Sequence, residues 1–255
     1  MSFLQKALAT IGIGAAKIDT RLSRPSFRAG EKVEGTIMIM GGNVDQEIDT
    51  IFLSLLTNYT RESNERFYHD LATIDKIKIS EPFTVLKNEI IEVPFTFPLA
   101  LSVPVTLGET KVWVKSGADI KHAVDPSDED TIIIKPSTFM SEILESILSL
   151  GFKINTARCL EASSRIKKHQ QYVQEFVFEP TVKEWIGKID DLEVIFFAET
   201  EEVYELMIEV NRKSEKANHY RLNEIDDESI VLLRGRRDEF AGFQERLKQV
   251  IDQYS

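Results

Sequence analysis

The chain of 255 residues contains a single cysteine, Cys159. An intrachain disulfide framework is therefore impossible, and such a composition suits a reducing compartment. Cys159 lies in FKINTARCL, which we interpret as a strand, so we expect its thiol to be a small buried side chain. The alternative, a reactive thiol, has no activating partner visible in the sequence.

Long apolar runs are also missing. No stretch approaches the roughly 20 apolar residues that a membrane-spanning helix needs. The segment MSFLQKALATIGIGAAK has one lysine before a short apolar run broken by Gly12 and Gly14, which is atypical of a secretory leader. Its spacing predicts a short amphipathic helix with one apolar face, made of Phe3, Leu4, Ala7, Leu8 and Ile11. Because cations are few on its polar face, we expect this helix to pack against the protein and to contact membranes only weakly.

Positive charge is in short supply. Lysine and arginine number 31 against 42 acidic residues, so the net charge is −11 and phosphate backbones are repelled. Nucleic-acid binding is therefore disfavoured. Two local basic clusters remain, SSRIKKHQQ at 163–171 and LRGRRDEF at 233–240, the second with Arg234, Arg236 and Arg237. They are either solvated surface or sites for an acidic partner, a phosphorylated peptide or an anionic membrane.

Catalytic signatures are absent too. The four histidines form no HxH, HExxH or i,i+4 pair, and no GxSxG elbow occurs. GIGAAK at 12–17 lacks the GK[ST] of a phosphate-binding loop. We therefore predict no catalytic residue, no metal site and no cofactor, and we expect a protein that is not an enzyme.

Period-two alternation dominates what is present. In EIIEVPFTFPL, apolar side chains fall on one face of a predicted strand, namely Ile91, Val93, Phe95, Phe97 and Leu99. Pro94 and Pro98 lack a backbone donor, so this strand should lie at a sheet edge or interrupt its ladder. Further strands are predicted at 32–40, 48–60, 76–85, 110–117, 131–136, 171–180, 190–199, 203–213 and 228–235. At 171–180, the apolar face is Tyr172, Phe176 and Phe178.

Two segments change to helical spacing. Residues 138–150 follow Pro136 and Ser137, and Gly151 stands where a left-handed cap belongs. Residues 238–254 begin at Asp238, a candidate N-cap. The second helix has an apolar stripe of Phe240, Phe243, Leu247, Val250, Ile251 and Tyr254.

The order of elements predicts an all-β protein in three parts. These are a β-sandwich at 1–135, a second sandwich at 136–237 that opens with the helix near 138–150, and a C-terminal amphipathic helix at 238–255. The stripe of the last helix must be covered, either by the second sandwich or by another chain. The candidate partner-binding residues are accordingly Phe240, Phe243, Leu247, Ile251, Arg234, Arg236 and Arg237.

The acidic stretch DPSDED at 125–130 has competing interpretations. Asp125, Ser127 and Glu129 alternate as in a calcium loop, but Pro126 stiffens the segment and neither the required glycine nor the distant glutamate follows. A polar turn before the strand at 131–135 fits better, because Asp and Pro both favour turns.

Several segments together resemble the bacterial sporulation-control family of the stage-zero M type. They are FLQKALATIGIGAAKIDTRL, GEKVEGTIMIMGGNVDQEID, TLGETKVWVKSGADIKHAVDPSDEDTIIIKP, VQEFVFEP and GKIDDLEVIFF, within residues 3–197. The resemblance implies an arrestin-like pair of sandwiches, a cytoplasmic regulatory role in sporulation, and no catalytic motif to transfer. In arrestin-like proteins buried charges hold the domains in orientation, so Asp125 or Asp128 could form a polar contact between the domains.

We therefore expect a non-enzymatic cytoplasmic regulator or adaptor that controls sporulation through contacts with protein partners. Pairing of two copies of the chain stays open. One alternative is a calcium-regulated binder or metal-dependent enzyme that uses 125–130. The other is a peripheral membrane scaffold that uses residues 1–11 and the basic clusters.

Overall fold

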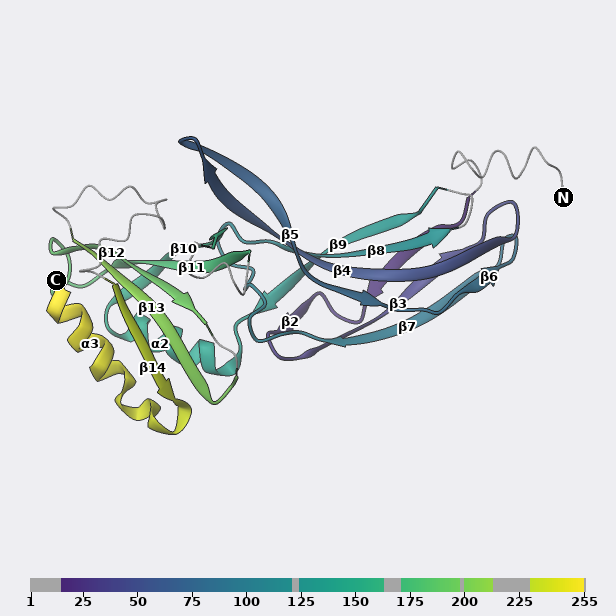
Figure 1. Ribbon diagram of the computed structural model, residues 1–255. Helices are drawn as coiled ribbons and strands as arrows, with labels where there is room; N and C mark the ends of the chain where they lie inside the picture. The colour runs from purple at the N-terminus through teal and green to yellow at the C-terminus, as the bar shows by residue number, and fades with distance from the viewer. Residues whose placement is uncertain (1–14, 121–123, 163–170, 198–199, 213–229, 255) are drawn as a thin grey trace. The chain divides into compact units, whose positions relative to one another are not determined.

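The structure is a computed structural model that describes residues 15–120, 124–162, 171–197, 200–212 and 230–254 (Figure 1). Strands dominate, and two α-helices accompany them, which confirms the predicted fold class at this level. The predicted helix at 1–11 and residues 163–170 of the first basic cluster lie outside the described residues.

The chain divides into two compact units. Unit 1 comprises Met1–Thr57, Thr73–Leu99 and Lys111–Ile133, and unit 2 comprises Asn58–Ala72, Ala100–Thr110 and Ile134–Ser255. The units are thus interleaved in sequence, whereas the predicted domains are continuous and meet at 135.

Hydrogen bonds from side chain and backbone show why residues 100–110 belong to unit 2. The Gln174 amide both accepts from the Val105 N–H at 2.8 Å and donates to the Val105 carbonyl at 2.7 Å. The Glu109 N–H donates to the Ala157 carbonyl at 2.9 Å. These bonds satisfy the backbone of a segment without strands of its own.

Unit 1 holds a three-stranded antiparallel sheet in the order β1 (Lys17–Leu22), β3 (Lys32–Met40) and β7 (Ile90–Pro98). The strands β2 (Ser26–Arg28), β4 (Gln46–Ser63), β5 (Arg66–Lys78), β6 (Phe83–Val85), β8 (Val112–Ile120) and β9 (Ser127–Lys135) complete the first half of the chain. Within unit 1, β4 pairs antiparallel with β6 and β8, and β8 pairs antiparallel with β9.

The prolines of β7 predicted that this strand lies at a sheet edge, and the structure confirms it. This strand ends its sheet, with Phe95 and Phe97 buried and Pro94 and Pro98 exposed. A Cβ on Gly35 of the neighbouring strand would lie 2.5 Å from the Phe95 ring, so the close packing of the two strands requires glycine.

The predicted strand at 76–85 is wrong in its extent. β5 ends at Lys78 and β6 begins only at Phe83. Between them the Ser80 hydroxyl, at 3.1 Å, accepts from the Ile51 N–H, and Pro82 has no donor to offer a ladder. Most of β5 escaped prediction because its side chains are largely exposed and show no apolar alternation.

Unit 2 is built on an antiparallel sheet in the order β14 (Ile230–Arg236), β13 (Val203–Arg212), β12 (Ile189–Phe196), β11 (Tyr172–Pro180) and β10 (Phe152–Glu161). The helices α2 (Thr138–Ser149) and α3 (Phe243–Tyr254) contact each other and pack with the sheet (Figure 1). The core between them buries Phe139, Ile143, Ile147, Phe176, Phe178, Trp185, Leu192, Val194, Leu206, Ile208, Phe243, Leu247 and Ile251.

The ends of α2 follow the predicted chemistry. The Ser137 hydroxyl accepts from the Met140 N–H at 3.1 Å, as an N-cap does. Gly151 adopts φ +90° directly after the helix, in the left-handed region that favours glycine. The helix predicted near 138–150 is therefore confirmed together with its signals.

The predicted start of the terminal helix is wrong. Residues Arg237–Gly242 form the 3₁₀ helix η1, and α3 begins at Phe243. Asp238 lies inside η1, whose N-cap position is Arg236 and has no side-chain cap, and its carboxylate accepts from the Arg236 guanidinium at 3.2 Å. The tighter first turn places the Phe240 ring in aromatic contact with Phe139 and Tyr204.

Candidate functional site

The apolar residues predicted to bind a partner lie inside unit 2. Phe243, Leu247 and Ile251 have no exposed surface and belong to the core between helices and sheet. Phe240 is partly buried and stacks on Phe243 at 5.0 Å between ring centroids. Of the two options left by the sequence, the stripe is covered by its own unit. A role in partner binding stays a prediction, and it would require α3 to leave the sheet.

Arg237, the third arginine of the basic cluster, has a structural contact. Its guanidinium lies 2.6 Å from the Glu142 carboxylate of α2 and 5.2 Å from the centre of the Phe139 ring. The ion pair thereby ties η1 to α2.

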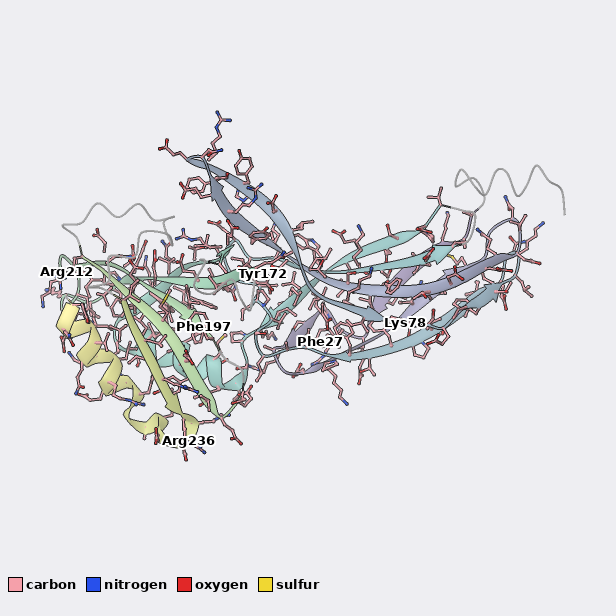
Figure 2. All side chains as sticks on the ribbon, viewed as in Figure 1. Phe27, Lys78, Tyr172, Phe197, Arg212 and Arg236 are labelled. Atoms are coloured by element: carbon pink, nitrogen blue, oxygen red, sulfur yellow. The ribbon has the colours of Figure 1, made fainter. Side chains whose placement is uncertain are left out.

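Arg234 and Arg236, by contrast, stand exposed on the edge strand β14. Their side chains are 72% and 62% exposed. Leu232, two residues before Arg234 on the same strand, is 59% exposed. Figure 2 labels Arg236 at the end of β14. The Arg234 guanidinium is 3.8 Å from the Glu205 carboxylate, and the Arg236 guanidinium is 3.2 Å from the exposed Asp238 carboxylate; both are weak surface pairs. The edge therefore keeps basic and apolar side chains available to a partner.

From Ser127 onward the acidic stretch is a strand and not a turn, contrary to the sequence interpretation. β9 begins at Ser127, so Asp128, Glu129 and Asp130 are strand residues opposite β8. Their alternation of partly buried and exposed side chains continues into the isoleucines, which explains why the ladder extends through them.

Asp125 and Asp128 each cap a backbone group of unit 1. The Asp125 carboxylate accepts from the Ile120 N–H at 3.0 Å, and the Asp128 carboxylate accepts from the Thr20 N–H at 2.7 Å. A polar contact of either residue between the units stays a prediction.

No group of three or more His, Cys, Asp or Glu side chains within the described ranges is arranged to hold a metal ion. Next to Asp128, the pKa of Asp130 is raised, first by partial burial and then by the charges of Asp128 and Asp19. His122 lies outside the described residues.

A buried charge cluster in unit 2 went unpredicted. Arg158 of β10 contacts one carboxylate oxygen of Glu175 on β11 with two nitrogens. Its Nε donates to this oxygen at 2.8 Å, and its Nη2 lies 2.7 Å from the same oxygen. Glu193 of β12 lies 3.8 Å from the same guanidinium. The Glu175 side chain is only 2% exposed, so this pair is desolvated and held by side chains from three adjacent strands.

Further carboxyls act on Glu175 and Glu193. Asp191 accepts from the Asn211 amide at 2.7 Å, and Glu209 stands opposite Glu193 on β13. Burial, followed by the charges of Glu175, Glu209 and Asp191, raises the pKa of Glu193 to about 9. Burial also raises the pKa of Glu175, against the opposing effect of the Arg158 guanidinium. We infer that Glu175 carries the charge paired with Arg158 and that Glu193 holds a proton at neutral pH.

The sequence did contain a signal for this cluster. At 171–180 we assigned Tyr172, Phe176 and Phe178 to one face of the predicted strand and made no assignment for the other face. However, Val173 and Val177 are apolar as well and fall on the second face, together with Glu175. Apolar residues on both faces indicate a strand that is buried on both sides.

The prediction for Cys159 is confirmed. Its side chain is 2% exposed on β10, and its sulfur lies 3.8 Å from the Thr110 hydroxyl. Burial among neutral groups suits a packing role.

Comparison with known proteins decides the family. The Spo0M family, SpoOM protein, matches residues 4–214. The chain belongs to the Spo0M family. The resemblance stated from the sequence is thereby confirmed.

Two relatives carry this assignment further. The sporulation-control protein spo0M of Bacillus subtilis (strain 168) is 35% identical over 260 residues, covering the whole of both chains. The crystal structure of Spo0M from Bacillus subtilis superimposes with a TM-score of 0.87 at 34% identity, covering 95% of this chain and 100% of that one. At this level of similarity the Spo0M fold extends over nearly all of the present chain.

Neither α2 nor α3, nor any other helix among the residues the structure describes, has the length and apolar character needed to cross a membrane.

Proposed function

We propose that this protein is a regulator in the control of sporulation. The observation that carries the proposal is the identity of 35% with a sporulation-control protein along the full length of both chains. Because the match includes both compact units, a shared role for the whole molecule is a better explanation than a shared module alone.

The proposed mechanism is contact with protein partners in the cytoplasm, without bond chemistry. It is supported by the contrast between side chains committed to the two cores and the exposed basic edge of β14. A single buried cysteine among 255 residues suits the reducing conditions of that compartment. The arrestin-like pairing of two sandwiches remains part of this proposal.

The test is complementation in Bacillus subtilis cells that lack their own Spo0M. Heat-resistant spore counts are compared with and without this chain, and crosslinking followed by mass spectrometry in sporulating cells identifies its neighbours. We expect the chain to change spore counts toward wild type and to crosslink to defined proteins. Unchanged counts would contradict the regulatory role, and restored counts without any crosslinked protein would contradict the contact mechanism.

A further inference from the structure

The edge strand β14 presents an unpaired row of backbone groups. Among the described residues it pairs on one side only, with β13. The Arg237 N–H donates to the Glu202 carbonyl at 2.8 Å, which makes this a hydrogen-bonded pair of the ladder. Hydrogen-bonded pairs alternate along an antiparallel ladder, so Gly235, Leu233 and Val231 bond toward β13. The backbone groups of Ile230, Leu232, Arg234 and Arg236 consequently point to the open edge.

The same four residues share one face of the sheet. Leu233 packs against the core, and Gly235 lies against the Tyr204 ring, so their neighbours face the other way. Across the ladder, Arg234 stands opposite Glu205, Leu232 opposite Met207 and Arg236 opposite Val203. Ile230 stands opposite Glu209 and is half-buried, whereas the rows of Leu232, Arg234 and Arg236 each end at the edge with an exposed side chain.

We propose that β14 binds an extended acidic segment of a protein partner by antiparallel strand addition. The partner strand would place carboxylates opposite Arg236 and Arg234 and apolar side chains opposite Leu232 and Ile230. Read from its N-terminus, it has the pattern acid-x-acid-x-apolar-x-apolar. Main-chain bonds supply affinity in this mode, and the alternate side chains supply specificity. The inference rests on the proposed contact mechanism and adds that the partner segment is acidic and extended.

Charge complementarity favours an acidic segment over a second copy of the chain. Two basic side chains gather on this edge of a protein whose net charge is −11. A second copy would bring the same arginines into the same patch and would add a second net charge of −11. A partner carboxylate instead extends the row from Glu205 through Arg234 with alternating sign.

The probe is a fluorescein-labelled peptide with the core Glu-Thr-Glu-Thr-Val-Thr-Val. Its binding to the full chain is measured by fluorescence anisotropy. Its matched control replaces both glutamates with lysine and keeps the valines. We expect the acidic peptide to bind and its affinity to fall with added salt, while the lysine peptide binds at least about tenfold more weakly.

Two variants of β14 and one control variant test whether the peptide binds to this strand. Arg234→Glu with Arg236→Glu should weaken binding of the acidic peptide at least about tenfold. Lys183→Glu with Lys188→Glu makes the same change in net charge at exposed positions outside the strands and should change the affinity less than about twofold. Leu232→Pro removes a backbone donor that points to the open edge, so the ladder to β13 is kept and peptide binding should be lost. Thermal unfolding of each variant confirms that it is folded.

Equal affinity of the acidic peptide for the two charge-reversed variants would overturn the proposal, as would equal binding of the acidic and lysine peptides. A dimer of the free chain that Leu232→Pro abolishes would assign the edge to a second copy instead. The peptide measurement is independent of the spore counts and crosslinks. Crosslinked partners without peptide binding would refute the acidic strand alone, and peptide binding without any effect on spores would refute the sporulation role alone.

Discussion

Two arginines on strands of the unit 2 sheet have opposite situations. Arg158 on β10 is buried and bonded to Glu175, whereas Arg234 on β14 is 72% exposed beside a more distant carboxylate. Both lie on strands of the same antiparallel sheet. The difference shows that burial, rather than residue type, decides whether a charge is held by the fold or remains available at the surface.

The largest expected effect is at the buried arginine. Arg158→Met leaves the Glu175 carboxylate buried without its partner, so the free energy of unfolding should fall by about 3–5 kcal/mol. Urea denaturation followed by circular dichroism measures it. Arg234→Met on β14 is the matched control and should change stability by less than about 0.5 kcal/mol. Similar losses for the two variants would remove the contrast between the two arginines.

Leucines sharpen the same contrast without charge. Leu247 of α3 is fully buried, so Leu247→Ala should cost about 2–5 kcal/mol through lost burial and the cavity left behind. Leu232→Ala on β14 removes a side chain that is 59% exposed and should cost well under half as much. If thermal unfolding shows only a small loss for Leu247→Ala, α3 is not part of the core of unit 2.

The pH dependence of stability should report the protonated carboxyl. Since the pKa of Glu193 is raised from 4.5 to about 9, the folded chain binds more protons than the unfolded chain between these values. The contribution of protonated Glu193 to the free energy of unfolding is fully present below pH 4.5 and is lost as the pH rises toward 9, by up to about 1.4 kcal/mol per pH unit.

Urea midpoints from pH 5.5 to 8.5 test this sign. Glu193→Gln cannot ionise, so its stability should fall less steeply with rising pH than that of the unmodified chain. Glu205→Gln, on β13 beside the surface, serves as the control and should follow the unmodified chain. A slope that is identical for all three proteins would show that Glu193 is already ionised at neutral pH.

Much of the architecture could be predicted from local patterns. The alternation through Phe95 and Phe97 located β7, and its prolines located it at an edge, because proline removes a ladder donor whatever the surroundings. Ser137 and Gly151 marked the ends of α2, since both act through the backbone of their own neighbourhood.

The surroundings of the candidate site residues were less accessible from the sequence. Arg234 and Arg236 are exposed as the basic cluster suggested, but Arg237 binds Glu142, far away in sequence. Asp128 belongs to a strand rather than a turn, because pairing with β8 outweighs the turn preference of Asp and Pro. The Arg158 cluster requires three strands to be aligned in register, which no single segment encodes.

The sequence by itself determined the mostly-β character, the two helices, the family and the edge nature of β7. The strands, the helices and the edge position depend on spacing and backbone chemistry within one segment, and the family depends on the residues of several segments read together. Only the tertiary structure decided that α3 covers its own sheet, that Glu175 is buried with Arg158, and that β14 is the edge strand among the described residues. Those outcomes depend on which segments meet, and the burial of a side chain is a property of its neighbours in space.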